Sequence, residues 1–197
     1  MLSQLYLIRH GETPWSLIGR HTSRTEVALT PKGEHDARAL AGRLRSVHFD
    51  EVFTSPRLRA RQTCEFAGFG DRCSIEPDLA EWDYGDYEGL RSTEIHQSIP
   101  DWNIYRDGCP NGESPAQMTT RVDRLIAKLR ARNGIVAAFS HGHFGRVLAS
   151  RWINAPLEDG KKLPLDPASV SVLGYSAEDP AKPVILRWNE TLESLDQ

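Results

Sequence analysis

Short apolar runs alternate along the chain with amphipathic stretches. Residues 5–8 and 135–139 are continuous apolar runs of strand length, as expected for strands buried on both faces of a sheet. Residues 51–54 predict a further short strand, and residues 74–79 predict a short extended segment. Two last strands, at 168–175 and 184–188, are expected to pair antiparallel at an edge. The pattern indicates an α/β fold.

Helices are predicted where apolar residues recur three and four positions apart. Thr30 and Ser114 each precede a proline and so mark helix N-termini. Ser55 and Pro56 open another helix, which carries three arginines in its first turns. The other predicted helices run over about 31–45, 115–132 and 144–153.

The segments between these elements have no helical or strand period, and they are expected to be loops. They cover residues 14–27, 81–89, 102–112 and 156–167. No internal repeat, low-complexity stretch or inter-domain linker is visible. A chain of this length with these features predicts a single domain over residues 1–197.

Composition narrows the class of protein. The hydrophobic fraction is 39% and the charged fraction is 26%, which is ordinary for a globular protein. A net charge of -3 gives no reason to expect nucleic acid or an acidic membrane as a partner. No apolar stretch reaches the length of a membrane span, so a cytoplasmic protein is expected. Cys64, Cys73 and Cys109 form no CxxC pair, which favours reduced thiols over disulfides or a zinc site.

Two buried strands are each followed at once by a histidine and a glycine. His10 follows the first run, together with Arg9, and His141 follows the run at 135–139. Ligands in α/β sheets bind beyond the carboxyl ends of the strands. If the two strands are parallel neighbours, His10 and His141 lie side by side.

Two further residues are candidates for the same site. Arg59 stands near the N-terminus of a predicted helix, where a cation opposes the helix dipole. It either helps to bind an anion there or simply points to solvent. Glu81 begins a loop rich in acids, aromatics and glycines. It is either a general acid whose protonated form is favoured by desolvation, or part of an acidic surface turn.

Two arginines and two histidines around one point suit a phosphoryl group, whose transition state spreads negative charge over its oxygens. The chain has no Walker glycine loop and no cluster of carboxylates at metal-ligand spacing. The reaction class that remains is metal-free phosphoryl transfer to a histidine nitrogen. Glu81 could protonate the leaving oxygen and then accept a proton from water.

Four ordered blocks of the sequence now identify a resemblance. They are residues 7–13 (LIRHGET), 29–33 (LTPKG), 54–63 (TSPRLRARQT) and 140–142 (SHG). Together they resemble the histidine phosphatase superfamily, the relatives of cofactor-dependent phosphoglycerate mutase. The resemblance extends over roughly residues 5 to 150.

The resemblance implies a three-layer α/β sandwich with a mostly parallel central sheet and helices on both faces. It implies that His10 is the phosphorylated nucleophile and that Glu81 is the proton donor. The phosphoryl oxygens would be held by Arg9, Arg59 and His141. The positions that correspond to substrate contacts are Ser16, Thr22, Ser23, Tyr84 and Gly142. The resemblance implies no metal and no cofactor.

Within the family, residues 81–90 and 102–109 look most like the sedoheptulose-1,7-bisphosphatase branch. This predicts a phosphatase of small phosphorylated sugars or sugar acids. A mutase that uses a bisphosphorylated primer and a phosphopeptide-binding member are the alternatives. Mutases carry a longer insertion between the acid and the second histidine, and a lysine where this chain has Ser92. Both departures favour hydrolysis.

Some assignments stay open at this stage. The sequence does not decide whether His21, Arg24, Arg106 or His143 contacts the substrate. The expected partner is a small phosphate ester. The edge strands near 170–172 and 184–186 could pair across a homodimer.

Overall fold

A single mixed sheet forms the centre of the computed structural model, which describes residues 2–192. Its strand order within that range is β3-β2-β4-β1-β5-β6. The strands are β1 (Leu2–Arg9), β2 (Glu51–Thr54), β3 (Cys73–Ile75), β4 (Gly134–Ser140), β5 (Val170–Tyr175) and β6 (Pro183–Glu190). β3, β2, β4 and β1 are parallel, whereas β5 pairs antiparallel with both β1 and β6. The sheet is mostly parallel with an antiparallel edge, as predicted.

The central strands are apolar on both faces because each face carries its own core. Leu5 and Leu7 of β1 pack into one hydrophobic cluster, and Tyr6 and Ile8 pack into the other. Residues 136–139 of β4 divide between the two clusters in the same alternating way. Alternate side chains of a strand point to opposite faces, so a strand between two helical layers needs an unbroken apolar run.

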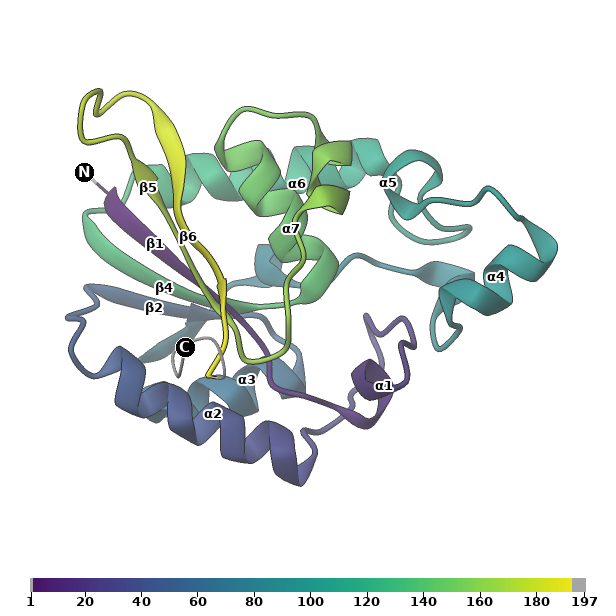
Figure 1. Cartoon of the computed structure of the whole chain (residues 1–197), viewed down its shortest axis with the longest axis horizontal. Coiled ribbons are helices and arrows are strands. Elements are labelled where there is room, and N and C mark those ends of the chain that lie inside the picture. The colour runs from purple at the N-terminus through teal and green to yellow at the C-terminus, as the bar shows by residue number, and fades with distance from the viewer. Residues whose placement is uncertain (1, 193–197) are drawn as a thin grey trace.

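Helices cover both faces of the sheet, as Figure 1 shows. α2 (Pro31–Leu44) and α3 (Leu58–Cys64) lie on one face, and α6 (Pro115–Arg130) and α7 (Gly142–Trp152) lie on the other. The apolar stripe predicted for the longest helix is buried in the core, at Met118, Val122, Leu125, Ile126 and Leu129. The predicted three-layer sandwich is therefore confirmed.

The two predicted N-caps start their helices as expected. The Thr30 hydroxyl accepts a hydrogen bond from the Gly33 N–H at 3.0 Å, at the start of α2. Ser114 and Gln117 form a reciprocal capping box at the start of α6. These local contacts satisfy N–H groups that have no partner inside a helix.

Several short helices lie outside the predicted elements. α1 (Pro14–Leu17) and α5 (Ile104–Asp107) lie in segments expected to be irregular, and α4 (Ser92–Ser98) lies between the predicted elements. The helix expected from Ser55 and Pro56 begins only at Leu58. Helices of four to seven residues are too short to show an apolar period, which is why the pattern missed them.

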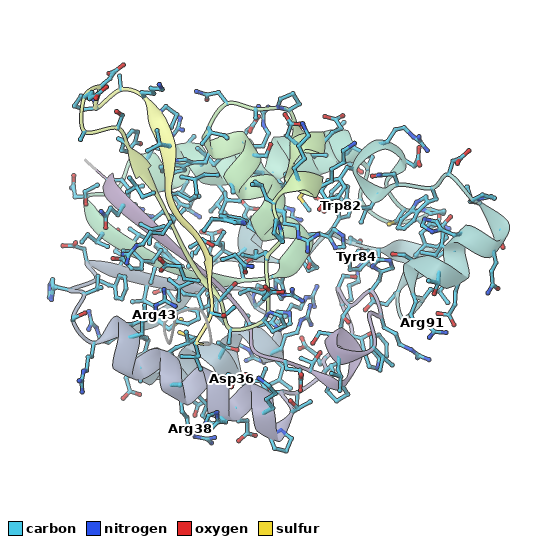
Figure 2. The ribbon with its side chains drawn as sticks, viewed as in Figure 1. Asp36, Arg38, Arg43, Trp82, Tyr84 and Arg91 are labelled. Carbon is cyan, nitrogen blue, oxygen red and sulfur yellow. The ribbon has the colours of Figure 1, made fainter. Side chains whose placement is uncertain are left out.

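Short helical segments of one or two turns complete the connections between these elements. A π-helical segment η1 (Glu65–Phe69) follows α3. The 3-10 turns are η2 (Gly70–Arg72), η3 (Pro77–Leu79), η4 (Gly85–Tyr87) and η5 (Leu157–Lys162). Trp82 and Tyr84 are both buried on the segment that leads from η3 toward α4 (Figure 2).

No helix among residues 2–192 is long and apolar enough to cross a membrane. Cys64, Cys73 and Cys109 are free thiols in this structure.

Candidate active site

The two histidines expected to meet do meet, at the carboxyl ends of two parallel neighbours. β1 pairs with β4 so that Arg9 lies opposite Ser140, and the next residues are His10 and His141. The His10 N–H donates to the Ser140 carbonyl at 2.9 Å. The two imidazole rings are 5.2 Å apart between centroids. The parallel register alone brings the rings into contact.

The His10 ring has one nitrogen engaged and one available. Its Nδ1 lies 2.7 Å from the Gly11 carbonyl oxygen, which can only accept, so the hydrogen-bond network assigns the ring proton to Nδ1. Nε2 then keeps its lone pair. Burial lowers the pKa of His10 well below its usual 6.5, and the positive charges of Arg59 and Arg9 lower it further. His10 is therefore a neutral imidazole at neutral pH, which is the nucleophilic form.

Tight backbone packing holds the loop that carries His10. A Cβ on Gly11 would lie 2.6 Å from the Gly33 carbonyl oxygen, and one on Gly33 would lie 2.2 Å from the Glu12 carbonyl oxygen. The Thr30 hydroxyl donates to Glu12 Oε1 at 2.7 Å, and Gly11 N–H donates to Thr63 Oγ1 at 2.9 Å. Three sequence blocks that are far apart along the chain thus pack into one support for the histidine.

The guanidinium groups of a buried arginine and a half-buried arginine flank the histidines. Arg59 is only 1% exposed, and its terminal nitrogens donate to backbone carbonyls, including that of Thr22 at 2.8 Å. Arg9 donates to the Leu165 carbonyl. Burial lowers the pKa of both arginines, and the nearby Glu81 carboxylate opposes that shift. Neither Nε has a hydrogen-bond partner among residues 2–192, so each is a buried donor that an anion would satisfy.

His141 presents a similar unused donor. Its Nε2 lies 2.7 Å from Ser55 Oγ, and that same oxygen accepts the Arg57 N–H at 3.3 Å. The Ser55 hydroxyl proton is free to donate to Nε2, and in that arrangement the His141 ring proton is on Nδ1. Burial lowers the pKa of His141 well below 6.5, with Arg59 next in effect, so the ring is neutral. Nδ1 has no hydrogen-bond partner in the part of the chain that the structure describes.

Glu81 is fixed by main-chain donors. Its Oε1 accepts the N–H groups of Trp82 at 2.9 Å and Phe144 at 2.7 Å. Its Oε2 accepts the His143 N–H at 3.1 Å. Two of these donors belong to the first turn of α7, where N–H groups have no partner inside the helix. The positive end of α7 therefore positions this carboxylate beside the two arginines.

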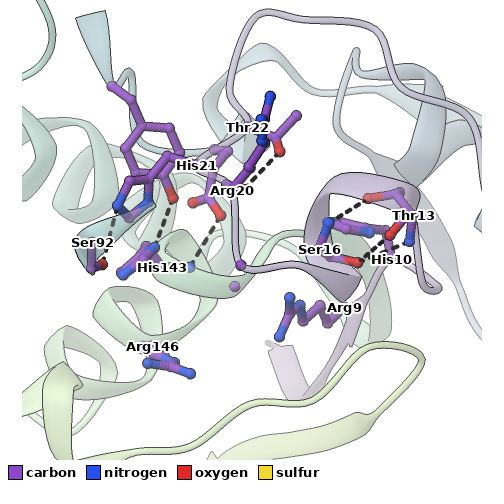
Figure 3. A pocket seen from close by; sticks show the side chains of 14 residues that line it. Arg9, His10, Thr13, Ser16, Arg20, His21, Thr22, Ser92, His143 and Arg146 are labelled. Atoms are coloured by element: carbon purple, nitrogen blue, oxygen red, sulfur yellow. Dashed lines mark hydrogen bonds between the residues drawn. The ribbon is translucent and has the colours of Figure 1, made fainter. Parts of the chain in front are cut away.

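A cavity of about 200 Å³ opens over these groups (Figure 3). Polar and charged side chains dominate its wall, and three elements of the fold supply most of them: the end of β1, the following loop and the start of α7. The lining residues are Arg9, His10, Thr13, Ser16, Gly19, Arg20, His21, Thr22, Glu81, Tyr84, Ser92, Gly142, His143 and Arg146.

The structure brings most of the predicted site residues to the cavity wall, but three of them lie elsewhere. Besides Arg9, His10 and Glu81, the cavity wall contains Ser16, Thr22, Tyr84 and Gly142. Arg59 and His141 are outside that wall and fully buried beside His10. Ser23 is also buried, and its hydroxyl donates to the Glu88 carboxylate. It lines a neighbouring cavity instead.

The residues that the sequence left open divide into two pairs. His21 and His143 line the cavity. Arg24 forms an ion pair with Asp83 and lines the neighbouring cavity. Arg106 is exposed and is ion-paired with Asp107 at 2.7 Å.

Five lining residues were not predicted, namely Thr13, Gly19, Arg20, Ser92 and Arg146. A sequence signal exists for Arg146, because it stands four positions after Gly142 on a predicted helix. Residues four apart share one helix face, so Arg146 follows Gly142 toward the same cavity. Ser92 comes from α4, a helix that the apolar pattern did not show.

A cluster of stacked rings forms one side of the cavity. The His21 ring packs on Tyr84 at 4.6 Å between centroids, and His21 Nε2 lies 3.3 Å from Ser92 Oγ. The Tyr84 hydroxyl lies 2.7 Å from His143 Nδ1. Burial lowers the pKa of His21 to about 4 and raises that of Tyr84 well above 10. These rings are therefore neutral hydrogen-bonding groups at neutral pH.

The arrangement defines the class of site. Its buried donors converge from two arginines and a histidine, and a neutral imidazole stands among them with a free lone pair. Such a set fits the oxygens of a phosphoryl group, together with an attacking nitrogen. An α/β sandwich with this site at the carboxyl edge of its sheet is built to handle a phosphate ester.

Comparison with known proteins agrees with this class. Residues 5–191 match the model of the histidine phosphatase superfamily (branch 1). An acid phosphatase of Mycobacterium tuberculosis is 41% identical over 178 residues, which cover 87% of this chain and 86% of that protein. A sedoheptulose 1,7-bisphosphatase of Saccharomyces cerevisiae is 36% identical, covering 74% of this chain and 66% of its own length. The solved structure of an open reading frame product of M. tuberculosis is 37% identical, with a TM-score of 0.87, and covers 96% of this chain and 98% of that one.

The chain belongs to branch 1 of the histidine phosphatase superfamily. It is a phosphoric monoester hydrolase that acts on small phosphorylated metabolites.

Proposed function

We propose that His10 is the nucleophile of this phosphatase and carries the phosphoryl group as a phosphohistidine. The observation that supports this most strongly is the His10 Nδ1 contact with the Gly11 carbonyl at 2.7 Å. It fixes the tautomer that leaves the Nε2 lone pair free, and the lowered pKa keeps the ring neutral. Nε2 is therefore the atom that attacks phosphorus.

Arg9, Arg59 and His141 hold the phosphoryl oxygens. Each has a buried N–H without a partner within residues 2–192, and a phosphoryl group supplies the acceptors that these donors lack. Their charges and dipoles are in place before the substrate binds, because backbone carbonyls and Ser55 fix their orientations. Prearranged donors of this kind stabilise the charge that develops on the equatorial oxygens.

Hydrolysis then takes two steps. In the first step, His10 Nε2 forms a bond to phosphorus while the ester P–O bond breaks, and the leaving oxygen takes a proton from the protonated form of the Glu81 carboxyl. In the second step, water attacks the phosphohistidine, Glu81 takes a proton from that water, and inorganic phosphate is released. One carboxyl group thus acts first as acid and then as base, which restores its starting state.

We infer that the substrate is a sugar phosphate, a sugar bisphosphate such as sedoheptulose bisphosphate, or a phosphorylated sugar acid. The likeness of residues 81–90 and 102–109 to the sedoheptulose-1,7-bisphosphatase branch supports this class, and so does the 36% identity to the yeast enzyme. The polar wall of the cavity suits the hydroxyl groups of such molecules, because His21, Ser92 and Tyr84 present hydrogen-bonding atoms.

The test is phosphate release from a panel of substrates in EDTA. The panel contains sedoheptulose 1,7-bisphosphate, fructose 1,6-bisphosphate, their monophosphates and phosphoglycerates. We expect turnover by the unaltered protein, none by His10→Ala, and normal turnover by His35→Ala, which removes an exposed histidine. A phosphorylated protein that is labile in acid and stable in alkali should be trapped only when His10 is present.

Other outcomes would contradict the proposal. Turnover that survives in His10→Ala would assign the nucleophile elsewhere. Transfer that depends on added 2,3-bisphosphoglycerate, with no phosphate release, would favour a mutase. Tight binding of phosphate esters without any release would favour a recognition module.

A further inference from the structure

The cavity contains hydrogen-bond donors that the proposed phosphoryl chemistry does not use. Arg146 and His143 lie on the side of the cavity away from His10 (Figure 3), and the exposed Arg20 is a further lining residue. The phosphoryl group at His10 already has the buried donors of Arg9, Arg59 and His141. A second group of donors at the other side calls for a second acceptor.

Arg146 is a cation without a carboxylate partner. It projects from α7, one turn after Gly142, and its buried Nε has no hydrogen bond within the described chain. None of the ion pairs among residues 2–192 includes it. The Tyr105 hydroxyl lies near Arg146: burial raises the pKa of this hydroxyl, and the positive charge of Arg146 opposes that shift. The hydroxyl is neutral, so it gives Arg146 no counter-charge. A partly buried guanidinium in this state favours an anionic ligand.

His143 adds a donor beside it. The Tyr84 phenol remains protonated because burial raises its pKa well above 10, and its oxygen lies 2.7 Å from His143 Nδ1. When the phenol donates to Nδ1, the His143 ring proton is on Nε2. Burial and the neighbouring His21 and Arg146 lower the pKa of His143 well below 6.5, so the ring is a neutral donor.

The cavity wall has few negatively charged groups that could pair with these donors. Glu81 is the one carboxylate among its lining residues in the described chain, and three main-chain N–H groups already bind it. The wall away from His10 therefore presents donors to whatever occupies the cavity. The complementary ligand group is one that only accepts, which is the character of a carboxylate or a phosphate.

We propose that Arg146, with His143, binds a second acidic group of the substrate, so that the enzyme selects phosphate esters that carry another carboxylate or phosphate. The exposed Arg20 adds positive charge to the cavity wall, which attracts such dianionic molecules. This assignment rests on the proposed phosphatase function of the same site. It divides the cavity into a reacting end at His10 and a selecting end at Arg146.

The test compares matched substrate pairs that differ in one acidic group. 3-Phosphoglycerate is paired with glycerol 3-phosphate, and fructose 1,6-bisphosphate is paired with fructose 6-phosphate. We expect the unaltered protein to have the higher kcat/KM on the diacid of at least one pair. Arg146→Gln should reduce that preference by about tenfold to a hundredfold, mainly through KM, because a charged hydrogen bond is lost. Arg146→Lys should retain part of the preference, because it keeps the charge.

The preferred pair tells a carboxylate from a phosphate as the second group. Arg106→Gln, which alters an exposed and ion-paired arginine outside the cavity, serves as the matched control and should leave all preferences unchanged. Equal losses on both members of each pair would overturn the inference, since Arg146 would then act on the reacting phosphoryl group. No preference in the unaltered protein would also overturn it. Failure of the phosphatase proposal would differ, because then p-nitrophenyl phosphate would not be hydrolysed either.

Discussion

Replacing Glu81 by glutamine separates its proton transfer from its place in the fold. Glu81 Oε1 accepts two main-chain N–H groups, from Trp82 and Phe144, and Oε2 accepts one, from His143. A glutamine at this position can keep its carbonyl oxygen where Oε1 lies and so retain the first two hydrogen bonds. Its NH₂ group cannot accept from the His143 N–H. The substitution therefore removes one hydrogen bond and the exchangeable proton.

The two losses differ in the free energy that each one costs. One hydrogen bond to a charged acceptor contributes about 1.5–3 kcal/mol, which bounds the effect on the free energy of unfolding. A general acid contributes about 10²–10⁴ in rate to the departure of a poor leaving group. That range corresponds to roughly 2.7–5.4 kcal/mol of activation free energy. An aryl leaving group such as nitrophenolate is a stable anion and needs little protonation, so its loss should stay within about tenfold.

The assay compares kcat/KM for a sugar phosphate and for p-nitrophenyl phosphate in the unaltered protein and in Glu81→Gln. This ratio includes steps only up to the irreversible departure of the leaving group, so it excludes the later attack of water. We expect a loss at least tenfold larger for the sugar phosphate. Glu34→Gln, a change of a partly exposed glutamate on α2 that pairs with Arg38, should leave both values unchanged.

Equal losses of kcat/KM on the two substrates would refute this reasoning and remove Glu81 from the role of proton donor. Urea unfolding of Glu81→Gln shows whether the variant is folded under the assay conditions. A variant that unfolds would be replaced by Glu81→Asp, which keeps a carboxyl group but withdraws it by one methylene.

Two further predictions concern stability. The pKa of His21 is about 4 in the fold against 6.5 when unfolded, so below pH 6.5 the unfolded chain binds more protons and stability falls toward pH 4. Urea unfolding should show that His21→Asn lacks this loss, about 2.5 kcal/mol between pH 7 and pH 4.5, and equal pH slopes for variant and parent would contradict the prediction. Gly33→Ala brings a Cβ within 2.2 Å of the Glu12 carbonyl oxygen and should cost at least about 2 kcal/mol, whereas Gly42→Ala on the same helix meets nothing within 4 Å and should add about 0.5–1 kcal/mol. Similar urea midpoints for the two glycine variants would show that the backbone contact does not control stability.

Much of the fold follows from periodicity alone. The apolar runs at 5–8 and 135–139 predicted strands between two helical layers, because only a strand buried on both faces needs an unbroken apolar run. The apolar stripe at 115–132 and the Ser114 N-cap predicted the longest helix in the same way. Helices α1, α4 and α5 could not be predicted, because their few residues have no measurable period and depend on local caps and tertiary contacts.

The sequence by itself predicted where the candidate residues lie, since Arg9, His10 and His141 directly follow apolar runs that are expected to be buried strands. It left the geometry open. Only the tertiary structure decided that Ser23 turns to Glu88, and that Ser92 reaches the cavity from α4. A strand end is fixed by a local apolar run, which can be read from neighbouring residues. The wall of a cavity forms where segments distant in the sequence pack together, and short-range patterns do not encode that packing.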